Sequence, residues 1–237
     1  MGYDSICVIR MALHREPMLG TEGSFAYTPY GEPPASLYTL RFERWAAVRA
    51  ALLMTRIFLT LAACSTLALF VALWLGLAIG DATVRETAVQ SRVAVHFLTG
   101  VAALVLAIMV HALVITYFMG TGRWLEETCA AYHLGAAWQV TSQSLKWRLY
   151  PALVGSLVLL IATGALGGAA DPASAVGFQG IGPLSAALVH RYAAIVALVV
   201  NAAVNGLEYQ VLRRNGILVN DVLAQVRRIR VERGLEV

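Results

Sequence analysis

Charged residues and cysteine are both scarce in this sequence. Only 14% of its 237 residues are Asp, Glu, Lys or Arg, and 59% are hydrophobic, whereas about 25% are charged in an ordinary soluble domain. The three cysteines, Cys7, Cys64 and Cys129, are scattered along the chain, and the topology derived below places none of them on the oxidising side of a membrane. We therefore predict no disulfide framework.

Several catalytic and binding motifs are also absent from the sequence. No glycine-rich phosphate loop follows a predicted strand, no Ser or Cys stands in a nucleophile elbow, and no paired carboxylates flank a predicted cleft. The formal net charge is +4, but the arginines lie beside apolar segments and form no separate basic domain. This pattern favours a membrane surface as partner and argues against nucleic acid. The absence of catalytic motifs favours a non-enzymatic role without deciding the question.

Long apolar runs are what the sequence has in abundance. About 20 residues at a rise of 1.5 Å cross the hydrocarbon layer of about 30 Å. Four segments reach this length or nearly so: 57–79, 93–119, 152–170 and 184–207. The sequence therefore predicts an all-α, polytopic membrane protein, a four-transmembrane-helix bundle over residues 51–207 with cytoplasmic helical extensions.

Three polar segments flank these predicted crossings. Residues 1–50 are rich in Pro, Gly and Tyr and are predicted to form a partly disordered N-terminal arm, whose true start is Met1, Met11 or Met18. Residues 120–150 are predicted to form a helical loop that turns near Gly135, with Pro151 close to the start of the third crossing. Residues 208–237 carry an apolar stripe and several arginines, and they are predicted to form a basic amphipathic helix.

Basic residues set the predicted orientation of the crossings. Of the 18 Lys and Arg residues, 14 fall in the N-terminal arm, the central loop and the C-terminal tail, and Arg56 directly precedes the first crossing. Cytoplasmic loops carry the excess of Lys and Arg. We therefore predict that both termini and the central loop are cytoplasmic and that the protein is a multi-pass protein of the cell inner membrane.

Histidines in the predicted crossings suggest one cofactor. His96 and His190 lie in the second and fourth crossings, at depths that differ by about 5 Å, so their rings are able to face one another. Two neutral imidazoles from different helices are what a low-spin b-type haem needs as axial ligands, and Arg191 could pair with a propionate. His111 lies about 22 Å along the helix from His96 and has no histidine partner in the first or third crossing. The alternative is that these histidines only bond neighbouring helices.

The fourth predicted crossing also carries two asparagines. His190 and Asn201 are eleven residues apart, or three helical turns, so they share a face, and Asn205 lies about 60° further round. Together with His111, this polar stripe should point into the protein. It could line a path for a small solute or a proton, but none of the predicted spans contains an Asp or Glu.

Two further spacings carry weaker signals. Glu126, Cys129 and His133 are separated by three and four residues, so on a helix they would share a face like metal ligands, but a fourth zinc ligand is missing. Gly164 and Gly168 stand at the spacing of a helix-packing motif. We interpret the first set as a solvated face and the second as a close helix contact.

Three functional hypotheses follow from these features. The leading one is a non-catalytic membrane subunit or scaffold of a larger complex, with the lipid bilayer and another protein as partners. The second is an electron-transfer subunit that holds one b-type haem between His96 and His190. The third is a small transporter or channel.

Overall fold

The chain is all-α apart from one very short hairpin. The computed structural model describes residues 35–235, with side chains from residue 54 onward. Residues 40–237 form one compact unit, and residues 1–39 form another, of which only the start of the first helix is described. The elements are α1 (Ala35–Leu77), α2 (Thr87–Tyr132), α3 (Ala137–Ala170), β1 (Gly180–Ile181), β2 (Leu184–Ser185) and α4 (Ala186–Glu232). The two strands pair in antiparallel fashion.

All four helices are long enough and apolar enough to cross a membrane. Large apolar side chains face outward in the middle of these helices: Val105, Val158 and Val199 are 59%, 61% and 63% exposed. Contiguous apolar surface of this kind is unfavourable in water and favourable in lipid. These four helices are compatible with an integral membrane protein, which is the class that the sequence predicts.

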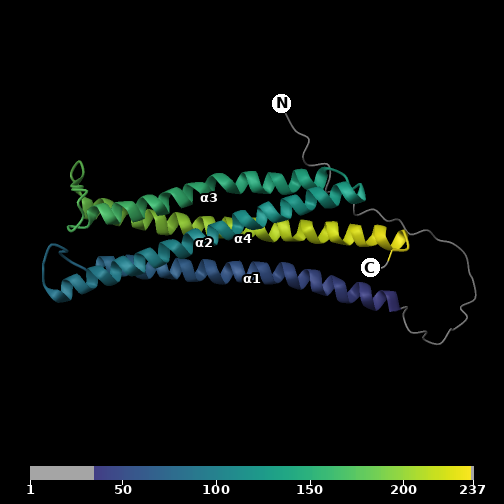
Figure 1. Cartoon of the computed structure of the whole chain (residues 1–237), viewed down its shortest axis with the longest axis horizontal. Helices are drawn as coiled ribbons and strands as arrows, with labels where there is room; N and C mark the ends of the chain where they lie inside the picture. Colours follow the sequence, from purple (N-terminus) through teal and green to yellow (C-terminus); the bar gives the residue numbers. More distant parts are fainter. Residues whose placement is uncertain (1–34, 236–237) are drawn as a thin grey trace, which may run out of the picture. The chain divides into compact units, whose positions relative to one another are not determined.

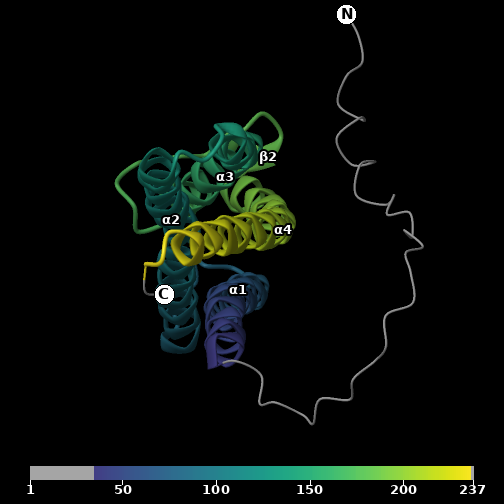
Figure 2. The same ribbon diagram turned by 90° about the vertical axis from the view of Figure 1, so that its right-hand side faces the viewer.

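The four helices of the larger unit run alongside one another (Figure 1). Helix α4 lies between α1 and α3, and Figure 2 shows the same order in a view along the helices. Helix α2 contacts α3 and α4, and it reaches α1 through His96. The connections 78–86 and 171–185 lie at one end of the helices, called here the loop end, and the turn 133–136 lies at the other, the hairpin end.

Two apolar clusters hold the helices together toward the hairpin end. The larger cluster joins all four helices through Phe58, Val110, Leu153 and Leu212, each 2% exposed or less. The second cluster packs Val222 of α4 against the turn between α2 and α3. Because these contacts extend beyond the apolar runs, the helices continue past the lengths that a membrane alone requires.

The helix boundaries differ from the predicted segments in several places. Helix α1 begins at Ala35, so residues 35–50 of the predicted arm are helical, while residues 1–34 lie outside the described part. Helix α3 begins at Ala137, which puts Pro151 inside the helix and not near its start. Proline lacks the N–H that an interior position would use, and its exposed side makes that loss tolerable.

The predicted C-terminal helix is not a separate element. Helix α4 runs without a break from Ala186 to Glu232, through the predicted boundary at residues 207 and 208. The reason is burial: Glu208, Leu212 and Asn215 all pack inside the helix bundle just after that boundary.

Candidate functional site

The rings of His96 and His190 meet near the loop end. His96 projects from α2 and His190 from α4, and their ring centroids are 6.2 Å apart with an angle of 66° between the ring planes. Both side chains are half-buried. The sequence predicts that these two rings can face one another, and the structure brings them together.

Each of the two rings is held by a backbone carbonyl of a further helix. His96 Nδ1 lies 2.9 Å from the carbonyl oxygen of Ala72 in α1, and His190 Nδ1 lies 3.2 Å from that of Thr163 in α3. A carbonyl only accepts hydrogen bonds, so each Nδ1 carries the hydrogen and donates it. In a neutral imidazole this leaves the lone pair on Nε2, directed away from the carbonyl. No hydrogen bond to either Nε2 is found among residues 54–235.

Two glycines make room for the two rings. Gly76 follows Ala72 by one turn of α1, and a Cβ on it would lie 2.8 Å from His96 Cε1. Gly167 follows Thr163 by one turn of α3, and a Cβ there would lie 2.8 Å from His190 Cε1. Real Cβ atoms do not approach that closely. The same arrangement of carbonyl, glycine and imidazole therefore occurs twice around one centre.

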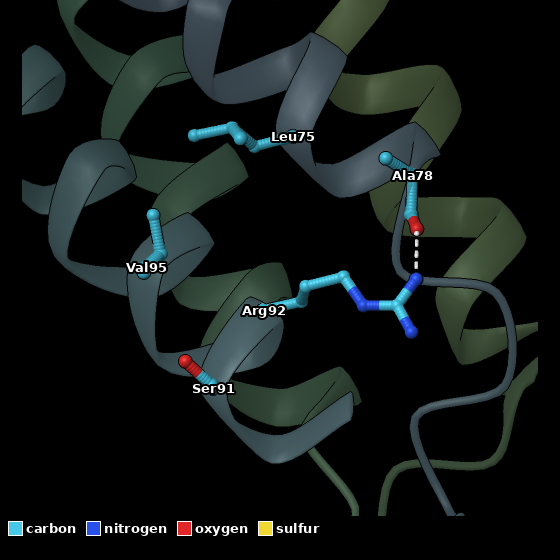
Figure 3. Close-up of a pocket in the computed structure, with 5 residues that line it drawn as sticks. All are labelled: Leu75, Ala78, Ser91, Arg92 and Val95. Atoms are coloured by element: carbon cyan, nitrogen blue, oxygen red, sulfur yellow. Dashed lines mark hydrogen bonds between the residues drawn. The ribbon is translucent and has the colours of Figure 1, made fainter. Parts of the chain in front are cut away.

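Two arginines lie close to this pair along α2 and α4, toward the loop end. Arg191 is exposed and adjoins His190 in sequence, and Arg92 is exposed one turn before His96 on α2. Arg92 Nη1 donates to the carbonyl oxygen of Ala78 at 3.3 Å. It also lines a cavity of about 140 Å³ between α1 and α2, together with Leu75, Ala78, Ser91 and Val95 (Figure 3).

The loop beside this cavity is fixed by an aspartate. The Asp81 carboxylate accepts hydrogen bonds from the backbone N–H and the hydroxyl of Thr83, at 2.9 and 2.7 Å. These two bonds, the hydroxyl one first, hold the pKa of Asp81 below its ordinary value.

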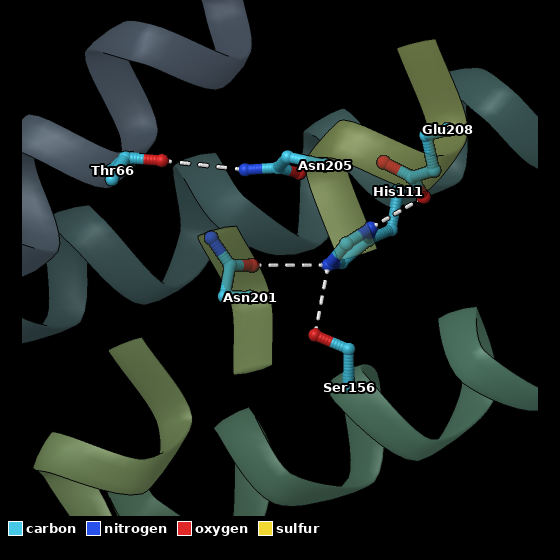
Figure 4. A network of polar contacts seen from close by, with 6 residues as sticks. All are labelled: Thr66, His111, Ser156, Asn201, Asn205 and Glu208. Atoms are coloured by element: carbon cyan, nitrogen blue, oxygen red, sulfur yellow. Dashed lines mark hydrogen bonds and ion pairs between the residues drawn. The ribbon is translucent and has the colours of Figure 1, made fainter. Parts of the chain in front are cut away.

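A second polar cluster lies deep between the helices (Figure 4). His111 and Glu208 are both 0% exposed, and His111 Nδ1 is 2.7 Å from Glu208 Oε1. His111 Nε2 lies 3.1 Å from Asn201 Oδ1 and 3.2 Å from Ser156 Oγ. The cluster thus joins α2, α3 and α4, and it lies about 22 Å along α2 from His96.

Asn205 extends this cluster to α1. Its Nδ2 donates to Thr66 Oγ1 at 3.3 Å. Nearer the hairpin end, Asn215 forms a third polar group: it accepts a bond from Ser142 at 2.9 Å and donates to Tyr117 and Thr121. Buried leucine, valine and phenylalanine side chains separate the two groups.

The chain was compared with protein-family models, curated protein sequences and solved structures. None of the three comparisons finds a match. The functional argument therefore rests on the chemistry of the residues themselves.

Sequence reasoning missed Glu208, which stands one residue beyond the predicted end of the fourth crossing. The prediction that the spans contain no Asp or Glu relied on a fourth span that was too short, because the buried part of α4 continues past residue 207. A signal was present: Asn201, Glu208 and Asn215 are spaced by seven residues, so they share one face of a helix. Ser156 offered no signal of its own.

The two weaker spacings have different outcomes. Among residues 54–235, no three His, Cys, Asp or Glu side chains come together as a metal site. His133 leaves helical geometry, with φ 53° and ψ 40°, and caps α2. It therefore does not share a helix face with Cys129. Gly164 does make a close contact, to Leu104 of α2, whereas Gly168 faces open space.

The two described cysteines, Cys64 and Cys129, are free thiols. Cys64 is exposed on α1 and Cys129 is buried on α2. Cys7 lies outside the described residues.

Proposed function

We propose that this protein is a membrane electron-transfer protein that holds one b-type haem between His96 and His190. The observation that carries the proposal is the position of the two rings, 6.2 Å apart on different helices. A metal–imidazole bond is about 2 Å long. With the ring centre about 1.1 Å behind the bonding nitrogen, two axial rings have centroids about 6.3 Å apart.

The protonation of the rings supports the same assignment. Histidines that bind metals usually donate the other ring N–H to a carbonyl or carboxylate, which fixes the tautomer and the ring orientation. The carbonyls of Ala72 and Thr163 accept such bonds from His96 and His190. In the neutral form of each ring, Nε2 is then the bare nitrogen that could bind a metal.

The surroundings of the rings fit a flat, largely apolar group. Gly76 and Gly167 lie against the ring edges, where any larger residue would displace them. Ala103 and Ala197, further along α2 and α4, are buried and small.

The proposal assigns a role to four residues near the loop end. His96 and His190 would be the axial ligands, and Arg191 and Arg92 would neutralise the propionates at the loop end. When bound, haem b supplies a one-electron couple whose potential depends on the axial ligands and on burial.

Membrane orientation is part of the proposal. The positive-inside pattern predicts that the protein lies in the cell inner membrane, with the hairpin end and both termini in the cytoplasm and the loop end outside. The haem would then lie in the outer half of the bilayer.

The sequence alone favoured a non-catalytic subunit or scaffold, with transport as a third hypothesis. The present proposal takes up the second of the three hypotheses in place of the first. A pure scaffold gives no reason for two facing imidazoles whose Nε2 atoms have no hydrogen-bond partner among residues 54–235. No observation specifically favours transport.

Haem content of purified protein tests this proposal. Wild type, His96→Ala, His190→Ala and the control His133→Ala would be made in haem-replete cells and assayed by pyridine haemochrome. His133 is exposed and lies at the far end of α2. We expect about one haem per chain in wild type and in His133→Ala, and almost none in the other two variants. Haem absent from folded wild type, or equal in all four, would reject the proposal.

A further inference from the structure

The number of protons on the buried pair His111 and Glu208 follows from the hydrogen bonds that the two side chains make. Asn201 Oδ1 only accepts hydrogen bonds, so His111 Nε2, 3.1 Å away, carries a hydrogen. If Nδ1 were bare and the carboxyl ionised, two acceptors would face one another across the 2.7 Å between Nδ1 and Oε1. One further proton must therefore lie between these two atoms, and the pair as a whole is neutral.

Polar atoms without partners surround this pair. Within residues 54–235, the buried side-chain atoms that lack a hydrogen bond are Asn201 Nδ2, Asn205 Oδ1, Glu208 Oε2 and Ser65 Oγ. The first three residues stand at positions i, i+4 and i+7 of α4, so they share one face. Asn201 and Glu208 are 0% exposed, and Asn205 is 8% exposed. A lone buried polar atom is costly in a membrane.

The three atoms on α4 match the bonding capacity of one water molecule. Asn201 Nδ2 is a donor, and Asn205 Oδ1 and Glu208 Oε2 are acceptors. A water accepts one bond and donates two, and buried waters typically make about three bonds to groups of this kind. In Figure 4, Asn201 turns its Oδ1 toward the His111 ring and its Nδ2 away from the ring, on the side of Thr66 and Asn205.

We infer that the cluster around His111 and Glu208 is a buried proton-binding site, with one proton shared by Nδ1 and Oε1 and one water bound to the face formed by Asn201, Asn205 and Glu208. The other members of the cluster, Thr66 of α1 and Ser156 of α3, are hydroxyls. His111 and Glu208 are therefore the two titratable side chains of this cluster.

This site gives the membrane interior a place to take up or release one proton. Uptake of a proton from water produces an imidazolium beside a carboxylic acid, with net charge +1. Release of one produces a neutral imidazole beside a carboxylate, with net charge −1. The inference does not depend on the haem, because the cluster lies about 22 Å along α2 from His96.

Nitrogen-15 NMR of histidine-labelled protein in lipid bilayers tests the shared proton. His111 would be assigned with His111→Gln, and wild type compared with Glu208→Gln and the control Glu126→Gln, whose side chain is exposed on the same chain. We expect the His111 Nδ1 shift of wild type and Glu126→Gln to lie away from that of a bare nitrogen, toward the protonated value. In Glu208→Gln the His111 Nδ1 shift should return to the value of the bare nitrogen in a neutral Nε2–H tautomer. A bare-nitrogen shift in wild type, or no change in Glu208→Gln, would overturn the inference.

Two measurements on wild type keep the test independent of variant folding. The Glu208 carboxyl carbon, labelled with carbon-13, should show a strong hydrogen bond to the ring nitrogen, and a shift of a free, hydrated carboxylate would contradict this. Polarisation transfer from water to the Asn201 side-chain amide should be observed if the water is bound. Its absence, with transfer present at exposed side chains of the same sample, would refute the bound water.

Discussion

Gly167 is the position where a single methyl group should separate haem binding from folding. In wild type, a Cβ at this position would lie 2.8 Å from Cε1 and 3.3 Å from both nitrogens of the His190 ring. Gly168, its neighbour in α3, has nothing within 4 Å of the same point. Gly167→Ala and Gly168→Ala therefore add the same methyl group and the same gain in helix propensity, but only the first pushes on His190.

The size of the effect follows from the contacts of His190. Restoring an ordinary contact of 3.4 Å requires the ring to move by about 0.6 Å. Moving away from α3, it would lengthen the bond from Nδ1 to Thr163, now 3.2 Å, beyond hydrogen-bonding distance. A lost hydrogen bond costs about 0.5–1.5 kcal/mol, and about 1.4 kcal/mol is tenfold in affinity. We therefore expect haem to bind about two- to twelvefold more weakly.

Transfer of haem to excess apomyoglobin measures this difference as a release rate and a retained fraction. Gly167→Ala should lose haem several-fold faster than wild type, and Gly168→Ala should match wild type. Equal retention in both variants would show that His190 is not held against α3 in the haem-bound protein. Equal loss in both would show a general effect of the methyl group on α3.

Three further predictions concern stability and topology. Glu208→Ala breaks a fully buried pair and should lower the free energy of unfolding by about 3–5 kcal/mol, measured by thermal unfolding in mild detergent. The control Glu126→Ala, at an exposed position, should change this free energy by less than about 0.5 kcal/mol. Similar unfolding midpoints for the two variants would contradict the burial of the pair. Leu153→Ala removes a side chain that is 0% exposed and should cost about 2–5 kcal/mol in the same assay, and a neutral result would show that the four helices do not pack there. A reporter fused after Val237 should be active only in the cytoplasm and one inserted near Ser174 only outside, and the reverse pattern would invert the orientation.

The positions of the four long apolar segments could be predicted from sequence because membrane crossing requires a certain length and composition. The runs 93–119 and 152–170 fall inside α2 and α3. What sequence could not supply was the continuation of the helices beyond the bilayer, since that depends on tertiary contacts. Val222, for example, is buried only because α4 packs against the turn between α2 and α3.

The two sites differed in how far sequence could predict them. His96 and His190 could be paired because the rise of a helix gives their depths. The tautomers of the two rings could not be predicted, because the carbonyls of Ala72 and Thr163 belong to other helices and carry no side-chain signal. Glu208 was missed since an acid at the edge of an apolar run looks like an end of the membrane, and only its contact with His111 shows that it is buried.

The optical spectrum of the wild-type protein, oxidised and then reduced with dithionite, tests the central claim most directly, because it reports the axial ligands of any haem present. Two imidazole ligands predict a low-spin spectrum in which sharp α and β bands appear on reduction. These bands should be lost when either His96 or His190 is changed to alanine. A featureless spectrum from haem-replete cells, or a high-spin spectrum that the two substitutions leave unchanged, would contradict ligation by this pair.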